Sequence, residues 1–127
     1  MKLQLDLKNQ TQYQVPSKKV IGGWILDVLK EQNINVDVEI GLKIVNKAVI
    51  HNFNKKYRQV DSPTDVLSFP LFDKIPDDSK EKILLGDIVI CYEIMTANAK
   101  KYGISIEGEF KKLIVHSTLH LLGCHHK

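Results

Sequence analysis

The residues best suited to chemistry lie at the C-terminal end of the chain, where four of its five histidines fall within eleven residues. His116 and His120 are four residues apart, so on a continuous helix their imidazoles lie on one face, about 5–6 Å apart at Cβ. This separation suits two ligands of one tetrahedral zinc ion. Gly123 follows where a helix would end, because glycine adopts the left-handed conformation without steric cost. A chain that turns back there can bring His126 to the same ion as a third ligand.

One residue of the zinc-peptidase pattern is absent from this segment. Zinc peptidases place a general-base glutamate directly after the first histidine, and Ser117 occupies that position here. Three protein ligands leave a fourth position for water, as in catalytic zinc sites, and zinc lowers the pKa of such a water to about 7. Isolated histidines in a helix are ordinarily core or surface residues, but the shared ligand spacing argues against that alternative. The pattern favours a metal-dependent hydrolase that is not a peptidase.

Length and composition indicate one globular domain over residues 1–127, with 43% hydrophobic and 26% charged residues, which is enough for a real core. The net charge of +3 fits a polyanionic partner, but it fits a merely solvated surface equally well. Cys91 and Cys124 are too few for a disulfide framework and favour a reducing compartment, with the cytoplasm as the default. No apolar run approaches the length of about 20 residues that a membrane span needs.

Hydrophobic periodicity predicts strands that alternate with helices. The apolar run 83–91 is the best candidate for a central strand, and Pro70 places the preceding strand, 66–71, at an edge. Further strands are expected over 3–7 and from 36 towards 44. Helices are expected over 16–32, 46–57 and 93–102, and after Ser105. The inner face of the helix 16–32 should carry Val20, Trp24, Ile25, Val28 and Leu29. The inner face of the helix 46–57 should carry Val49, Ile50 and Phe53. The sequence therefore predicts an α+β fold, a small mixed, mostly parallel sheet of about four strands packed with helices, with the metal site on the last helix and the following turn.

Three blocks of the sequence carry a resemblance to a known family. They are Tyr57-Arg58-x-x-Asp61-x-Pro63-Thr64-Asp65-Val66-Leu67-Ser68-Phe69-Pro70, then Leu85-Gly86-Asp87-Ile88-Val89-Ile90, then the histidine segment. In order and spacing they resemble the YbeY family from about Val36 onward. The resemblance implies a zinc-dependent endoribonuclease specific for single-stranded RNA. It also implies roles in small-subunit ribosomal RNA 3′-end maturation and ribosome quality control, with ribosomal RNA, the small subunit and ribosome-associated factors as partners.

This chain departs from the family at three positions of the histidine segment. The family usually has glycine at position 117, tyrosine at 124 and aspartate at 125, where this chain has Ser117, Cys124 and His125. Serine is small enough to be tolerated in place of glycine. Cysteine and histidine are competent ligands, but the turn after Gly123 should aim alternate side chains apart. We therefore expect His126, rather than Cys124 or His125, to be the third ligand.

Arg58, the only arginine of the chain, is the best candidate for a catalytic group outside the histidine segment. A guanidinium can pair with two oxygens of a phosphodiester as negative charge develops during cleavage, and the resemblance singles out the same residue. The alternative is a structural ion pair with Asp61 or Asp65.

Weaker candidates for substrate binding are Lys55, Lys56, Thr64 and Ser68. The lysines could contact the RNA backbone or form only a solvated helix face. Thr64 and Ser68 could equally well organise the loop. Two other functions stay open: a different metallohydrolase, and a ribosome-associated RNA-binding protein with a structural metal and little nuclease activity.

Overall fold

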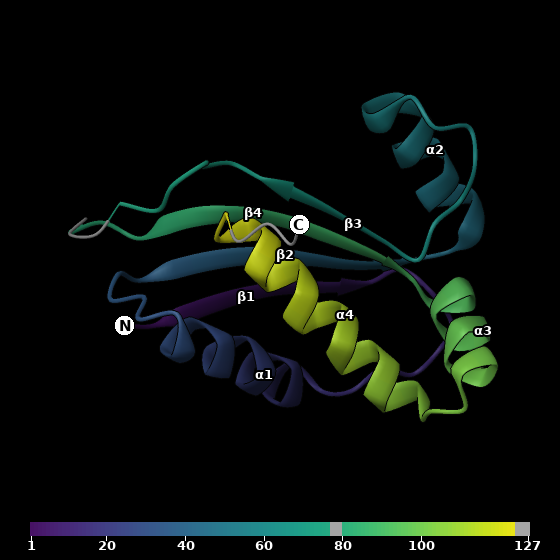
Figure 1. Ribbon diagram of the computed structural model, residues 1–127, viewed down its shortest axis with the longest axis horizontal. Coiled ribbons are helices and arrows are strands. Elements are labelled where there is room, and N and C mark those ends of the chain that lie inside the picture. The colour runs from purple at the N-terminus through teal and green to yellow at the C-terminus, as the bar shows by residue number, and fades with distance from the viewer. Residues whose placement is uncertain (77–79, 124–127) are drawn as a thin grey trace.

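A four-stranded sheet with helices on both faces forms the protein (Figure 1). The structure is a computed structural model that describes residues 1–76 and 80–123. Its elements, in chain order, are β1 (Leu3–Asn9), α1 (Lys18–Glu31), β2 (Val38–Val45), α2 (Lys47–Arg58), β3 (Val66–Pro70), β4 (Ile83–Cys91), α3 (Tyr92–Tyr102) and α4 (Ile106–Leu121).

The sheet is mixed and mostly parallel, as the sequence predicts. Its strand order is β1-β2-β4-β3; β2 pairs in parallel with both β1 and β4, and β3 pairs antiparallel with β4. The apolar segment β4 therefore has a neighbour on each side, and β3 lies at an edge and ends at Pro70. The predicted α+β class, the central position of 83–91 and the edge position of β3 are all confirmed.

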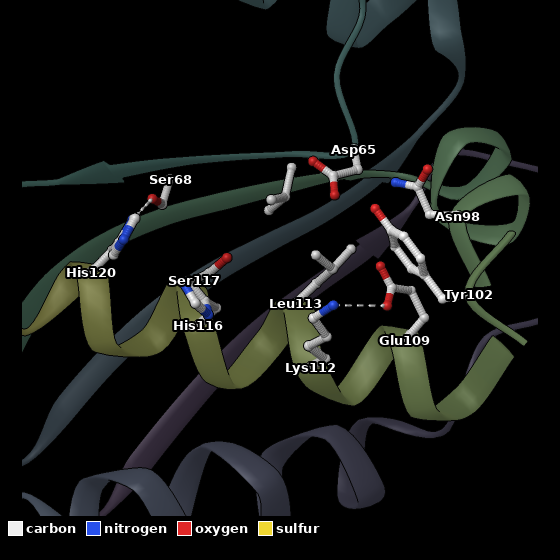
Figure 2. A pocket seen from close by; sticks show the side chains of 11 residues that line it. Asp65, Ser68, Asn98, Tyr102, Glu109, Lys112, Leu113, His116, Ser117 and His120 are labelled. Atoms are coloured by element: carbon white, nitrogen blue, oxygen red, sulfur yellow. Dashed lines mark hydrogen bonds and ion pairs between the residues drawn. The ribbon is translucent and has the colours of Figure 1, made fainter. Parts of the chain in front are cut away.

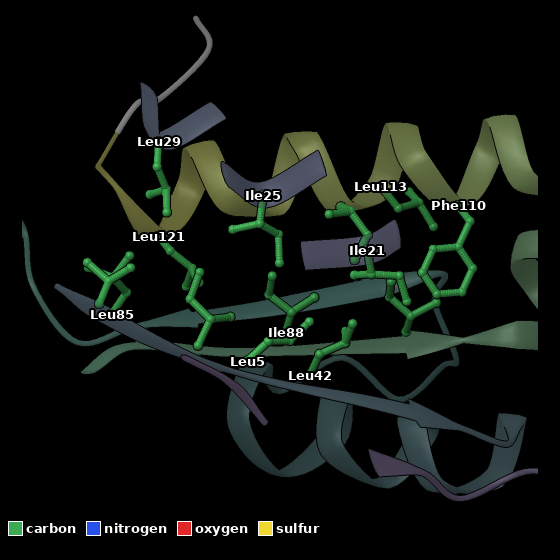
Figure 3. Close-up of a cluster of buried hydrophobic side chains, with 14 of the residues drawn as sticks. Leu5, Ile21, Ile25, Leu29, Leu42, Leu85, Ile88, Phe110, Leu113 and Leu121 are labelled. Carbon is green, nitrogen blue, oxygen red and sulfur yellow. The ribbon is translucent and has the colours of Figure 1, made fainter. Parts of the chain in front are cut away.

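Each face of the sheet carries its own hydrophobic cluster, because successive side chains of a strand point to opposite faces. In β4, Ile88 and Ile90 belong to the larger cluster, and Val89 and Cys91 to the smaller one. Helices α1 and α4 cover the first face and α2 lies on the other (Figure 3). The larger cluster takes its helical residues mainly from two elements: Ile21, Ile25 and Leu29 of α1, and Phe110, Leu113, Ile114 and Leu121 of α4.

Side-chain caps define where the helices begin. The Oγ atoms of Ser17 and Ser105 accept hydrogen bonds from the third residue into α1 and α4, which satisfies a backbone N–H that a helix N-terminus leaves unpaired. At α2 the cap comes from another element, since Glu93 of α3 accepts from the N–H of Lys47 at 2.7 Å. Gly103 ends α3 with φ of +69°. The bond between Lys47 and Glu93 ties α2 to α3 where the central strands β2 and β4 end.

The predicted inner faces of two helices were wrong at one position each. Val20 is 41% exposed and Ile21 is fully buried instead, whereas Ile25, Val28 and Leu29 are buried as predicted. Val49 of α2 is 37% exposed, and the buried residues there are Ile50 and Asn54. In both helices the valine lies at the boundary of the apolar stripe, where sequence spacing alone does not fix the helix rotation.

Gly86 allows strands β3 and β4 to approach each other closely. It has φ of +145°, and a Cβ atom there would lie 2.2 Å from the carbonyl oxygen of Phe69. The register of β4 against β2 shifts at the same place, between Glu39 and Ile40. A bulge with glycine bends a strand locally, so Gly86 helps to place β3 against the rest of the sheet.

We expect Gly86→Ala to lower the free energy of unfolding by about 2 kcal/mol or more, because the new methyl group meets backbone and the φ angle suits glycine alone. Gly23→Ala in α1 is the matched control: a Cβ there meets nothing within 4 Å, so stability should stay unchanged or rise by up to about 1 kcal/mol. Urea unfolding of both variants measures this. Equal stability of the two variants would contradict the close approach at Gly86.

Candidate active site

A cleft of about 280 Å³ runs along α4, where this helix faces β3 and the end of α3 (Figure 2). It is lined by residues from all three elements and the segment before β3: Asp65, Val66, Ser68, Asn98, Tyr102, Glu109, Lys112, Leu113, His116, Ser117 and His120. The histidines lie at one end of the cleft, and most of the acidic and aromatic side chains lie at the other.

The histidine end of the cleft consists of Ser68, His116, Ser117 and His120. His116 and His120 occupy one face of α4 with their ring centroids 5.5 Å apart, as a spacing of four residues requires. Ser68 Oγ of β3 lies 3.4 Å from His120 Nδ1, a long hydrogen bond. Ser117 is 3% exposed and supplies a hydroxyl where zinc peptidases have a carboxylate. The edge strand thus helps to orient one imidazole of the predicted pair.

Gly123 ends this helix in the way that the sequence predicts. Its φ of +82° is left-handed, and its N–H donates to the carbonyl of His120 at 3.0 Å. A Cβ atom at Gly123 would lie 2.6 Å from the carbonyl oxygen of Asp73. The turn after α4 therefore packs against the segment that follows β3, and only glycine satisfies both constraints.

The histidine pair fits two ligands of one metal ion. Across residues 1–76 and 80–123, no group of three or more His, Cys, Asp or Glu side chains is placed to hold a metal. The predicted third ligand, His126, and its neighbours Cys124 and His125 lie outside the described residues. Metal binding by His116, His120 and His126 therefore stays a prediction.

The acidic end of the cleft consists of Asp65, Asn98, Tyr102, Glu109 and Lys112 (Figure 2). Glu109 is 1% exposed, and its Oε1 has no hydrogen-bond partner among the residues that the structure describes. The nearest cation is Lys112 Nζ at 3.7 Å. This end of the cleft was missed by the sequence analysis. The available signal was a charged residue one helical turn before Leu113 on a face that is otherwise buried.

Arg58 does not line this cleft. It ends α2 on the opposite face of the sheet, where its guanidinium lies 5.3 Å from the ring centroid of Phe69. Its Nη2 donates to the backbone carbonyl of Ser68 at 2.6 Å. Arg58 and His120 thus contact the same residue of the edge strand, Arg58 through the backbone and His120 through the side chain.

The loop between α2 and β3 is organised without Arg58. Asp61 accepts a hydrogen bond from His51 at 2.7 Å, and Asn54 Nδ2 donates to the carbonyl of Ser62 at 2.9 Å. The described residues show no ion pair of Arg58 with Asp61 or Asp65, so that alternative is wrong. The bond from His51, followed by the positive charge of Lys55, lowers the pKa of Asp61. The bond between His51 and Asp61 therefore stabilises the fold at a pH above the pKa that Asp61 has in the unfolded chain. This stabilisation is lost as the pH falls through the lower pKa that Asp61 has in the folded protein.

The remaining candidates divide between the two faces of the sheet. Ser68 lines the cleft. Thr64 donates to the carboxylate of Asp65 at 3.3 Å, beside the cleft. Lys55 and Lys56 are exposed in the last turn of α2, and Lys56 Nζ lies 5.2 Å from the ring of Tyr57. Neither lysine lines the cleft.

The fold and the cleft define a small α+β domain that presents a histidine pair beside an edge strand. The family model for endoribonuclease YbeY matches residues 5–127. A relative named endoribonuclease YbeY from Treponema denticola is 42% identical over 107 residues, which cover 84% of this chain and 68% of the relative. Another of that name, from Caldicellulosiruptor saccharolyticus, is 41% identical over 126 residues, 92% of this chain and 80% of the relative. The chain therefore belongs to the endoribonuclease YbeY family, as its motifs indicate.

A solved structure has the same fold. The solution structure of a protein from Thermotoga maritima superimposes with a TM-score of 0.64 at 25% identity, covering 97% of this chain and 75% of that one. Among the described residues, every helix is too short or too polar to cross a lipid bilayer.

Because Arg58 makes one backbone hydrogen bond at an exposed edge, we expect Arg58→Ala to lower the free energy of unfolding by less than about 1 kcal/mol. Asn54→Ala is the contrasting variant: Asn54 is 6% exposed and its loss leaves the Ser62 carbonyl unpaired, which should cost about 1–3 kcal/mol. Thermal unfolding of both variants tests this. A larger loss for Arg58→Ala than for Asn54→Ala would make Arg58 mainly structural.

Proposed function

We propose that this protein is a zinc-dependent endoribonuclease that cuts single-stranded RNA at the histidine end of the cleft. The observation that carries the proposal is the pair His116 and His120 on one face of α4, held beside Ser68 of the edge strand. Membership of the endoribonuclease YbeY family supports the reaction class, since the relatives bear that name. Ser117 occupies the position of the general-base glutamate of zinc peptidases, which argues against a peptidase.

His116, His120 and His126 would hold the metal, and a hydroxide generated from bound water at neutral pH is the chemistry that zinc supplies in such sites. The chain's own contribution is orientation. Ser68 Oγ lies at His120 Nδ1, and a partner at one ring nitrogen directs the other towards a ligand. The buried face of α4 keeps both rings in place, and Gly123 ends the helix beside the carbonyl of Asp73.

Arg58 would contact a phosphate of the RNA at the edge of β3. Its guanidinium already lies at the backbone of Ser68, whose side chain belongs to the histidine end. The rings of Phe53, Tyr57 and Phe69 pack together beside it, and Tyr57 is 51% exposed. Exposed aromatic rings next to cationic side chains suit single-stranded RNA. An RNA strand that crosses the edge of β3 would meet the cleft on one face and Arg58, Lys55 and Lys56 on the other.

Ribosomal RNA is the proposed substrate class, with the cytoplasm as the compartment and the small ribosomal subunit and its associated factors as partners. The family name supports cleavage of RNA, and the resemblance of the three sequence blocks implies maturation of the small-subunit 3′ end and ribosome quality control. The net charge of +3 is compatible with a polyanionic partner. Cys91 is a buried free thiol, consistent with a reducing compartment.

Zinc content tests whether the metal binds at His116 and His120 rather than at His51, the other histidine among the described residues. We expect about one zinc ion per chain in the wild-type protein and well below one in His120→Ala. His51→Ala is the matched control, because His51 pairs with Asp61 on the other side of the molecule, and it should keep the wild-type value. Atomic absorption on the purified proteins measures this. Unchanged zinc in His120→Ala would exclude the assigned site.

Cleavage kinetics test the role of Arg58. Arg58→Ala should retain zinc and fold but cut single-stranded RNA about 10²–10³ times more slowly, the usual cost of losing a preorganised electrostatic donor. Arg58→Lys should recover only part of the rate, because a point charge cannot form a bidentate contact. Single-turnover assays at saturating protein give the rates.

A chelator provides the control for both experiments. Wild-type protein should lose cleavage when zinc is removed and regain it when zinc is added back. Full-rate cleavage by folded Arg58→Ala would remove Arg58 from the mechanism. RNA binding without any cleavage by the zinc-loaded wild-type protein would favour the RNA-binding alternative with a structural metal.

A further inference from the structure

The acidic end of the cleft takes no part in the chemistry described above. We propose that it binds the base of a nucleotide next to the cleaved phosphate, and that it prefers guanine. The inference rests on the proposed function, because it assigns this end of the same cleft to the RNA substrate. It starts from Glu109, whose side chain is 2% exposed and lines the cleft.

Glu109 is poorly satisfied by the protein itself. Its Oε1 has no hydrogen-bond partner in the described part of the chain, and the 3.7 Å to Lys112 Nζ exceeds hydrogen-bond length. A buried carboxylate oxygen without a hydrogen-bond donor lowers the stability of the fold. The next residues on the same face of α4 are Leu113, which is apolar, and Ser117, which is small. A ligand that brings N–H groups to this point would supply the missing donors.

The charges at this end favour a base over a phosphate. Asp65 and Glu109 bring two carboxylates to the lining, against the single ammonium group of Lys112. Like charges repel the phosphate backbone, whereas N–H donors are attracted. The side chains of Asp65, Asn98, Tyr102 and Glu109 converge in this part of the cleft (Figure 2), so a base edge would meet acceptors there and the backbone would remain nearer the histidines.

Guanine fits this set of groups best among the four bases. Its N1–H and N2–H are parallel neighbouring donors that match the two oxygens of one carboxylate, as in other bidentate pairs. Adenine and cytosine offer one amino group on that edge, and uracil one N–H. The O6 of guanine, next to N1, can accept from Lys112, whose side chain is 59% exposed and can turn from Glu109 to the base.

Tyr102 supplies a surface for stacking. The residue is 55% exposed, and Lys112 Nζ lies 5.1 Å from its ring centroid. Aromatic side chains commonly stack on splayed-out bases of single-stranded RNA. Glu109 precedes His116 by seven residues, about 10 Å along the helix axis. This separation is comparable to the size of one nucleotide, so the base would belong to a nucleotide beside the cleaved bond.

The test uses the full chain and the nucleosides guanosine, inosine and adenosine, which carry no phosphate. Binding is followed by NMR shifts of the backbone amides near Asn98 and Tyr102. Guanosine should bind at least about fivefold more tightly than adenosine, with inosine between them because it lacks the N2 amino group. Equal affinity for all three, or no shift with any of them, would overturn the proposal.

Variants assign the preference to Glu109. Glu109→Gln keeps the shape but removes the paired acceptors, so guanosine should lose its advantage over adenosine. Lys111→Ala is the matched control, since Lys111 is exposed on α4 and does not line the cleft, and the advantage should persist. Tyr102→Ala changes an exposed side chain and should weaken all three nucleosides about tenfold, which keeps the test decisive if Glu109→Gln fails to fold. A guanosine preference that survives Glu109→Gln would overturn the assignment.

Failure of this inference and failure of the proposed function give different results. Nucleoside binding requires no cleavage, so a guanosine preference in a protein that cuts no RNA would refute only the nuclease assignment. Conversely, cleavage that proceeds at the same rate beside guanosine, inosine and adenosine in matched oligonucleotides would refute only the base subsite.

Discussion

The packing of α4 against the sheet is the constraint on which the site depends. Phe110, Ile114 and Leu121 are fully buried on one side of this helix, and at 3.6 residues per turn their burial fixes the direction of every other side chain. His116 must then face outward, and His120 must face the boundary with β3. A rotation by one residue would move Phe110 towards water, so the hydrophobic effect holds the histidine pair in position.

The edge strand connects the cleft to the other face of the sheet. Ser68 points towards α4, and its neighbours Leu67 and Phe69 point towards α2, as the two-residue period of a strand requires. An edge strand also leaves backbone groups without a strand partner, and Arg58 uses one of them, the Ser68 carbonyl. The Arg58 segment and the histidine segment of the family motif therefore meet at one strand although they cover different faces.

Local signals in the sequence predicted much of this arrangement. The apolar run of β4, Pro70 at the end of β3, the cap at Ser105 and the left-handed Gly123 each have a physical cause within a few residues, and each was predicted correctly. The features that were not predicted depend on how elements pack together. Arg58 lies opposite the cleft because α2 covers the far face of the sheet at β3. Glu109 is buried because α3 packs against α4 near it. Neither property can be read from spacing.

The most direct test of the account is an anomalous diffraction map, recorded at the zinc edge, of crystals grown with a short single-stranded RNA that carries a non-cleavable linkage. We expect a zinc peak bonded to His116 and His120, with the uncleaved linkage beside it and RNA density crossing the edge of β3 near Ser68. A zinc peak away from this histidine pair, or RNA bound only at a distance from the cleft, would contradict it.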